Sequence, residues 1–420
     1  MKDTLPRGMD VTLYATAQEN GLFFNIIAAD FSKKHVEHLF WRTSYPHLDF
    51  LYPQWWKKKD IVLSDDFWWE SVKMAEKLFK WDIIDSHKMF SLPNEGFGKG
   101  LSSVYGTFYP HAKIRQPVVN QKGVMLSGTA AQDIQAAGLQ LTQHFSEKLV
   151  IIVLNFLSVD IYEYTPKTVG NARKWTADVK KVSFESPMEF LDRIVSKRFM
   201  SFLSSDLPQE HVFNSVMNYL YWKPAVTSSE QARDMVRAVY TELLAELVSY
   251  TGIGKAQKGH LVVTGEVPSF LVEKQYTELL CIDGLGISGT WSMYVDTYAL
   301  LLPMLLKSQH EEMPLPMIIP SSDIMVIPAQ LSDRDIVKAM VDKKEYLATS
   351  GNIYRYKIES YAPKAEITLP KSQISFSLPT GMKFKSLLVD ARKWPVVYGP
   401  TPASNVARVP AWLQRLKTML

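Results

Sequence analysis

The spacing of apolar and polar positions predicts a chain with strands at both ends and helices in the middle. Residues 11–17 and 22–28 are two apolar stretches joined by a polar turn at 18–21, which predicts a β-hairpin. Residues 149–157 and 159–164 predict either a second hairpin or one bulged strand.

Three helices are predicted in the middle of the chain, over residues 187–200, 209–220 and 229–250. The last is the best marked, because Ser229 is a typical N-cap and Gly252 a typical stop. Its apolar residues recur at helical spacing and form one stripe: Ala232, Val236, Val239, Leu243 and Leu247.

A strand, a turn and another helix follow this segment. The apolar residues 261–263 predict a buried strand that enters a turn at 264–268. A helix is predicted over 270–281, then a turn at 283–284 and a strand over 291–295.

Beyond about residue 320 the pattern alternates with period two, which predicts a small sheet or sandwich. Its predicted strands are 324–327, 352–359, 365–369, 373–378 and 385–389. We therefore divide the chain into an aromatic-rich N-terminal part (1–147), a central domain (148–320) and a β-rich C-terminal region (321–420).

Composition narrows the class of protein. The 420 residues are 46% hydrophobic and 21% charged, which excludes a disordered or fibrous chain. The net charge of +4 is too small for a dedicated nucleic-acid binder. Cys281 is the only cysteine, so neither an internal disulfide nor a cysteine-based zinc site can form. With no apolar run near 18 residues and no signal-like N-terminus, we expect a cytoplasmic protein.

Tryptophans are concentrated in the N-terminal part. Trp55 and Trp56 precede three lysines at 57–59, a combination that suits a membrane headgroup interface. The alternative is a solvated loop whose rings enter the core. Because buried aromatic residues anchor protein interfaces, we predict contacts with protein partners at Trp55, Trp56, Trp68 and Trp69.

Motifs for catalysis are weak. The glycine-rich segments 94–100 and 252–255 resemble phosphate loops, but neither has the context of a Walker motif, and we interpret both as turns. His35 and His38 have no third ligand at metal spacing. The residues by themselves therefore predict no catalytic group and no metal site.

Several segments between about 140 and 395 resemble the glutamate mutase L family. The passage from Asn214 to Pro224 is similar to that family's asparagine, short helix and proline. Ile282-Asp283-Gly284-Leu285 and the closing Asp390-Ala391-Arg392 with Pro395 follow in the family's order. That family is actin-like, so the resemblance implies an α/β, ribonuclease H-like fold of two lobes that close on a nucleotide. Residues 1–147 would then be a reduced first lobe or an unrelated domain.

The resemblance also implies where a nucleotide would bind. The family's second phosphate hairpin falls on Asn155-Phe156-Leu157-Ser158, its adenosine turn on Thr264-Gly265-Glu266, and its first hairpin on Asp30-Phe31-Ser32-Lys33. The implied cleft residues are Asp30, Asn155, Ser158, Gly265 and Glu266. All three loops depart from the family pattern, because Asn155 replaces an aspartate, Leu157 a glycine and Glu266 a glycine, and the first hairpin lacks its glycine.

These departures predict a degenerate nucleotide cleft. A leucine side chain occupies space that a phosphate needs, and a glutamate adds negative charge beside a polyanion. We therefore predict a non-catalytic pseudo-ATPase without a cofactor, acting as a scaffold or assembly protein through protein partners. Two alternatives stay open: a chaperone or reactivating factor that uses ATP and magnesium, and a peripheral membrane assembly protein like actin-fold components of pilus or secretion machines.

Overall fold

The computed structural model describes residues 10–18, 21–30, 35–43 and 87–91 as backbone strands, and most of 135–301, 319–392 and 408–419 with side chains. Contacts group the chain into two units. The first contains residues 1–137, 221–225 and 300–318, and the second contains residues 138–220, 226–299 and 319–420.

The first unit contains a four-stranded sheet in the order β3-β2-β1-β4. Its strands are β1 (Asp10–Gln18), β2 (Gly21–Asp30), β3 (His35–Thr43) and β4 (His87–Ser91). The first three strands form an antiparallel meander, and β4 pairs with β1 in parallel. The pair Gln18–Gly21 closes the turn between β1 and β2, so the predicted N-terminal hairpin is confirmed.

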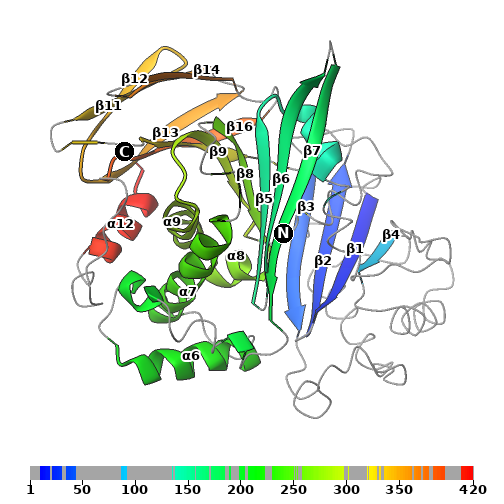
Figure 1. Ribbon diagram of the computed structural model, residues 1–420. Helices are drawn as coiled ribbons and strands as arrows, with labels where there is room; N and C mark the ends of the chain where they lie inside the picture. Colours follow the sequence, from blue (N-terminus) through cyan, green and yellow to red (C-terminus); the bar gives the residue numbers. More distant parts are fainter. Residues whose placement is uncertain are drawn as a thin grey trace, which may run out of the picture. The chain divides into compact units, whose positions relative to one another are not determined.

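The second unit is built on an eight-stranded mixed sheet in the order β13-β16-β10-β9-β8-β5-β6-β7, which Figure 1 shows together with its helices. The strands are β5 (Lys148–Asn155), β6 (Ser158–Val169), β7 (Ala172–Ser183), β8 (Lys258–Thr264), β9 (Gly289–Val295), β10 (Ser322–Ile327), β13 (Ile353–Tyr361) and β16 (Lys383–Asp390). β5 and β6 are a hairpin, which decides between the two predicted alternatives.

The strand directions identify the topology. β5, β6 and β7 form an antiparallel meander, and β8 and then β9 are added in parallel on the other side of β5. This is the ribonuclease H-like arrangement of an actin-type lobe. In the first unit, strands β3-β2-β1-β4 have the same order and directions as β7-β6-β5-β8 of the second unit. The predicted α/β, actin-like fold class is therefore confirmed.

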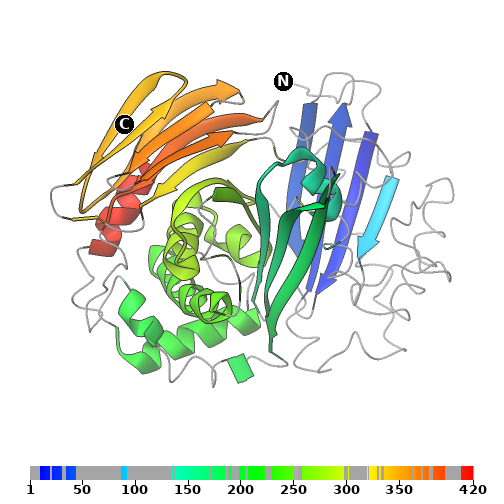
Figure 2. The same ribbon diagram turned by 45° about the horizontal axis from the view of Figure 1, so that its top comes forward.

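The strands after residue 320 are shared between two sheets. β10, β13 and β16 extend the eight-stranded sheet beyond β9, and Figure 2 shows these yellow to orange strands at the end of the sheet away from β5–β7. The others form a four-stranded sheet in the order β12-β11-β14-β15: β11 (Ile336–Val341), β12 (Lys344–Thr349), β14 (Lys364–Leu369) and β15 (Ser372–Ser377).

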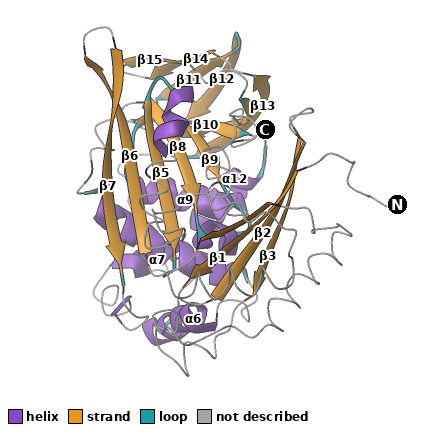
Figure 3. Ribbon diagram, turned by 90° about the vertical axis from the view of Figure 1, so that its right-hand side faces the viewer, coloured by secondary structure: helices purple, strands orange, loops and turns teal. Residues whose placement is uncertain are grey.

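Helices α7 (Glu230–Val248), α8 (Glu266–Leu271) and α9 (Lys274–Leu285) pack against one face of the eight-stranded sheet, as Figure 3 shows. The second unit also contains α6 (Gln209–Trp222), α12 (Arg408–Lys417), which contacts β13, and short 3-10 helices at Thr142–His144 and Arg198–Phe202. The Ser229 hydroxyl accepts a hydrogen bond from the Ala232 N–H at 3.1 Å, so the predicted cap of α7 is confirmed. Among the described residues, no helix is long and apolar enough to cross a membrane.

Two predicted turns are helical in the structure. Residues 266–268 form the first turn of α8. Pro268 is compatible with this position, because a proline in the first turn of a helix interrupts no hydrogen bond. Asp283 and Gly284 lie inside α9, where Gly284 is a contact point with α7. A Cβ on Gly284 would lie 3.0 Å from the Leu244 Cβ and from the Thr241 carbonyl oxygen, so the glycine allows the two helices to approach closely.

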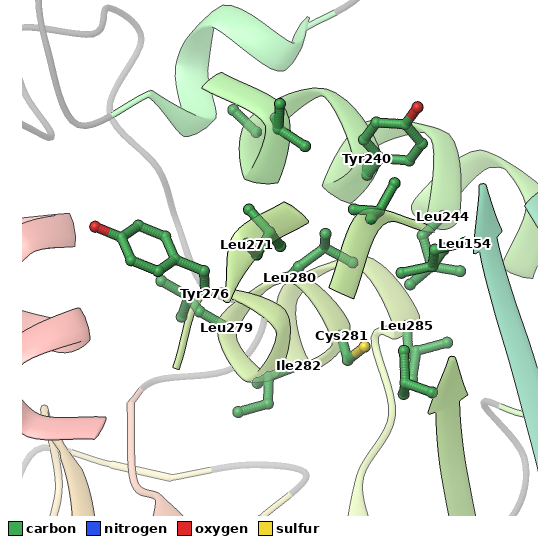
Figure 4. Packing of buried hydrophobic residues seen from close by; sticks show 14 of the residues in the cluster. Leu154, Tyr240, Leu244, Leu271, Tyr276, Leu279, Leu280, Cys281, Ile282 and Leu285 are labelled. Carbon is green, nitrogen blue, oxygen red and sulfur yellow. The ribbon is translucent and has the colours of Figure 1, made fainter. Parts of the chain in front are cut away.

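The core lies between these helices and the sheet. β5 is apolar on both faces and buried from Leu149 to Leu154, as expected for a strand between parallel and antiparallel neighbours inside a covered sheet. Figure 4 shows the α9 side of this core, with Cys281, Leu280 and Leu285 among the buried side chains. Cys281 is fully buried, and burial raises the pKa of its thiol, so it is a packed side chain of the core.

Candidate functional site at the carboxyl edge of three parallel strands

The carboxyl ends of β5, β8 and β9 meet at one edge of the sheet. These adjacent parallel strands end at Asn155, Thr264 and Val295, and the chain continues from them with Phe156, with Gly265 and with Asp296. In open α/β sheets, ligands bind outside the carboxyl ends of the parallel strands. This edge is therefore the candidate functional site.

Glu266 connects two of these strand ends. Its carboxylate Oε2 accepts a hydrogen bond from the backbone N–H of Phe156 at 2.9 Å, in the turn between β5 and β6. In return, the Glu266 N–H donates to the Asn155 Oδ1 at 3.3 Å. The Asn155 side chain also donates to the Ser158 hydroxyl at 3.5 Å, across the same turn. Glu266 is only 5% exposed, so its charge is directed into the site and away from bulk solvent.

Tyr240 of α7 holds the same turn from the core side. Its hydroxyl donates to the Phe156 carbonyl oxygen at 2.6 Å. The Phe156 ring packs edge-to-face against Tyr240 and against Phe270, with centroid distances of 6.4 and 5.6 Å. Burial, and after it the negative charge of Glu266, raise the pKa of Tyr240, so its hydroxyl keeps the proton that it donates.

Gly265 is required by the path of the backbone from β8 to α8. Its φ of 112° lies in a region that side chains with a Cβ rarely adopt. A Cβ at this position would also lie 2.5 Å from the Leu154 carbonyl oxygen. The glycine thus lets the start of α8 pass directly against the end of β5, which brings Glu266 within reach of Phe156.

Asp296 and Thr264 form a second polar pair at this edge. The Thr264 hydroxyl donates to the Asp296 Oδ2 at 2.7 Å, and the Asp296 N–H donates to the Val263 carbonyl oxygen at 2.8 Å. Asp296 is 1% exposed. Burial raises the pKa of Tyr294, and the negative charge of Asp296 raises it further. We did not predict Asp296 as a site residue. The sequence feature that could have identified it is its position directly after the predicted apolar strand 291–295.

The structure brings together four of the five predicted cleft residues: Asn155, Ser158, Gly265 and Glu266. Asp30 ends β2 in the first unit, so its role in a cleft stays a prediction. In strand order, the counterpart of the Asn155–Ser158 closing pair is Gln18–Gly21 and not Asp30, because each pair closes the first hairpin of its unit. Leu157 and the four predicted contact tryptophans, Trp55, Trp56, Trp68 and Trp69, lie outside the described residues.

The residues present do not fit a nucleotide phosphate. The resemblance implies that the β5–β6 turn presents backbone N–H groups to phosphate, but the Phe156 N–H donates to the carboxylate of Glu266. Asp296 adds a second buried carboxylate at the same edge, and both would repel a polyanion. Within the part of the chain that the structure describes, no cluster of three or more His, Cys, Asp or Glu residues could hold a metal ion.

Two motifs of the family resemblance have a structural role. Arg392 donates to Asp283 at 2.7 Å and to Asp390 at 2.8 Å, and its guanidinium lies 4.5 Å from the centre of the Trp412 ring in α12. Arg392, Asp390 and the Asp283 carboxylate are almost fully buried. The motifs around residues 283 and 390 therefore join α9, the end of β16 and α12, and neither is shown to contact the candidate site.

Two further ion pairs, one buried and one partly buried, connect α9 with the extension of the sheet. Arg355 of β13 pairs with Glu278, and Lys274 pairs with Asp323 of β10. Because an unpaired buried charge is costly, these pairs tie the extension strands to α9 in one register.

No protein-family model matches the chain, and no curated protein matches it in sequence. Among solved structures, the ethanolamine utilization protein EutJ from Carboxydothermus hydrogenoformans is 11% identical, with a TM-score of 0.34 over 72% of this chain and 89% of that chain. A PilM–PilN type IV pilus biogenesis complex is 10% identical, with a TM-score of 0.34 over 74% and 97%. MreB 5 of Spiroplasma citri bound to AMPPNP is 11% identical, with a TM-score of 0.32 over 73% and 97%. Likenesses this distant carry no argument about function, and the fold class rests on the strand order.

Proposed function

We propose that this chain is a non-catalytic actin-fold protein that works as a scaffold or assembly component through contacts with other proteins. The observation that supports this proposal is the hydrogen bond from the Phe156 N–H to the Glu266 carboxylate. In a site that binds nucleotide, a backbone donor of this turn would face a phosphate oxygen. In this chain it faces a side chain of the protein itself.

The energetic cost to a nucleotide follows from that bond. A phosphate that takes the Phe156 N–H must leave the buried Glu266 carboxylate without this donor, at a cost of about 1–3 kcal/mol. That cost corresponds to a loss in affinity of roughly 5- to 150-fold. Repulsion between the carboxylate and the phosphate adds to it.

Thermal unfolding with and without millimolar magnesium ATP, with ADP as a second ligand, tests the proposal. A ligand at 100 times its dissociation constant would stabilise the folded state by about 2.7 kcal/mol and move the midpoint by several degrees. We expect no shift with either nucleotide and no release of phosphate from ATP. A saturable shift, confirmed by calorimetric titration, would contradict the proposal.

The second candidate is a nucleotide-dependent chaperone or reactivating factor resembling the glutamate mutase L family. The observation in its favour is the Thr264–Asp296 pair, because a carboxylate at the end of a central strand can orient a hydrated magnesium ion. Its test is ATP hydrolysis by the wild type and by Asp296→Asn. Turnover that the substitution abolishes would support this candidate over the first.

The contact surface itself stays a prediction at Trp55, Trp56, Trp68 and Trp69. A double variant, Trp55→Ala with Trp56→Ala, should lose partner proteins that the wild type retains in a pull-down, while its thermal midpoint stays the same. Retention of every partner would remove these residues as the surface. Binding of the wild type to anionic vesicles at low salt would instead favour a peripheral membrane assembly protein.

A further inference from the structure

We infer that the β5–β6 turn is an oxyanion-binding site whose resident anion is the carboxylate of Glu266, and that a small carboxylate or phosphate takes its place when this side chain is shortened. The inference rests on the proposed function, because it gives the reason why the turn is closed to nucleotide. It assigns to Glu266 the role of an internal ligand that blocks the site.

The first support is the way Glu266 is seated. Its Oε2 lies 2.9 Å from the Phe156 nitrogen, although the two residues are 110 positions apart in the chain. Its own N–H is held by the Asn155 Oδ1. A backbone N–H that donates to a buried carboxylate has the donor chemistry of an oxyanion site, since phosphate and carboxylate oxygens accept the same bond.

The second support is the rigidity of the turn, which does not depend on the Glu266 side chain alone. Phe156 is 1% exposed and is fixed by the Tyr240 hydroxyl and by the rings of Tyr240 and Phe270. Gly265 lies against the Leu154 backbone. Shortening Glu266 should therefore leave the Phe156 N–H in place and remove the acceptor in front of it.

The third support is that the residues next to the turn are not fully buried. Asn155, Ser158 and Gly265 are all partly exposed. The Ser158 hydroxyl and the Asn155 amide lie at the same turn and offer further polar contacts. Formate and acetate are suitable probes because they match the group that is removed, and inorganic phosphate tests whether a tetrahedral anion is accepted.

The experiment compares the full-length wild type with Glu266→Ala and Glu266→Gln. Glutamine is the matched control, because it keeps an acceptor oxygen of nearly the same size in front of the Phe156 N–H. Thermal midpoints are measured in sodium formate, sodium acetate and sodium phosphate against sodium chloride at equal ionic strength. We expect at least one oxyanion to raise the midpoint of Glu266→Ala saturably, by several degrees more than the midpoints of the other two proteins, which show only the general stabilisation that such salts give a folded protein.

A spectroscopic measurement covers the case in which Glu266→Ala is too unstable for a melting curve at high temperature. In protein labelled with 15N-phenylalanine, the Phe156 amide signal of Glu266→Ala should move saturably with formate at low temperature. The same signal should not move in Glu266→Gln. Equal shifts in all three proteins, or no response of the Phe156 amide in Glu266→Ala, would overturn the inference.

Failure of this inference can be distinguished from failure of the proposed function. If wild type is stabilised by magnesium ATP, the proposed function is wrong and Glu266 is not a block. The other case is that nucleotide does not shift the midpoint of the wild type and none of the three oxyanions saturably shifts that of Glu266→Ala. The proposed function then stands, but Glu266 is not the internal ligand of an anion site.

Discussion

Replacing Asp160 by asparagine should make the protein more stable at neutral pH, by an amount that grows between pH 4 and 7. Asp160 lies in β6, is 5% exposed, and faces Lys181 of β7 across the antiparallel pair, with 3.6 Å between Oδ1 and Nζ. Burial raises the pKa of this carboxyl group from 3.8 to about 6, against the opposing effect of the Lys181 charge. The folded state therefore binds the proton more tightly than the unfolded chain does.

The sign and size of the effect follow from this difference in pKa. Because the folded pKa lies above the unfolded value, the stability that protonated Asp160 contributes is present below pH 3.8 and is lost as the pH rises to about 6. The difference between 6 and 3.8, at about 1.36 kcal/mol for each pKa unit, corresponds to about 3 kcal/mol. Asparagine does not ionise, so the variant should escape this loss.

Urea unfolding of the wild type and of Asp160→Asn from pH 3.5 to pH 8 measures the effect. The difference between the two free energies of unfolding should increase with pH by about 3 kcal/mol in favour of the variant. All other titrating groups cancel in this difference. Asp178→Asn on β7 is the control for the loss of a carboxylate, since Asp178 has a side chain that is 62% exposed. A difference that stays constant across the pH range would refute the reasoning.

Three further predictions concern packing and buried charge. Arg392→Met should lower the free energy of unfolding by about 3–5 kcal/mol, because it removes the cation that pairs with the buried Asp283 carboxylate. Urea unfolding measures this change, and a loss below about 1 kcal/mol would contradict the prediction. Gly265→Ala should destabilise more than Gly284→Ala in parallel melting curves, because Gly265 combines a positive φ with a 2.5 Å approach to backbone, whereas Gly284 meets neighbours at 3.0 Å. Equal losses would contradict this ranking. The Cys281 thiol, whose pKa burial raises, should react with a thiol reagent only as fast as the protein unfolds; rapid labelling in native buffer would show that it is accessible.

Local sequence patterns determined much of the secondary structure. The stripe of α7 and its Ser229 cap, the first hairpin and the C-terminal strands could be read from spacing, because each depends on residues only a few positions apart. The polar edge strand β7 and the strands β11 and β12 were not predicted. In β7, exposed charged residues obscure the strand pattern, as is common at a sheet edge.

The tertiary structure decided what the glycines and acids do. From the sequence, Gly284 indicates a turn; in the structure it is the point where α9 meets Leu244 of α7, a neighbour 40 positions away. Glu266 could be recognised as a departure from a family pattern, but only the fold brings it to the N–H of Phe156. Asp283 and Arg392, which are 109 positions apart, could not be paired from spacing at all.

The physical reason is the range of the interactions. Hydrophobic periodicity and helix capping act along the chain, so the sequence by itself determines which segments become strands or helices. A buried charge is stable only beside its partner, and that partner is set by which strands become neighbours in the sheet. The α/β class was therefore determined by the sequence, whereas the closing of the β5–β6 turn by Glu266 was decided only when β5 and β8 paired side by side.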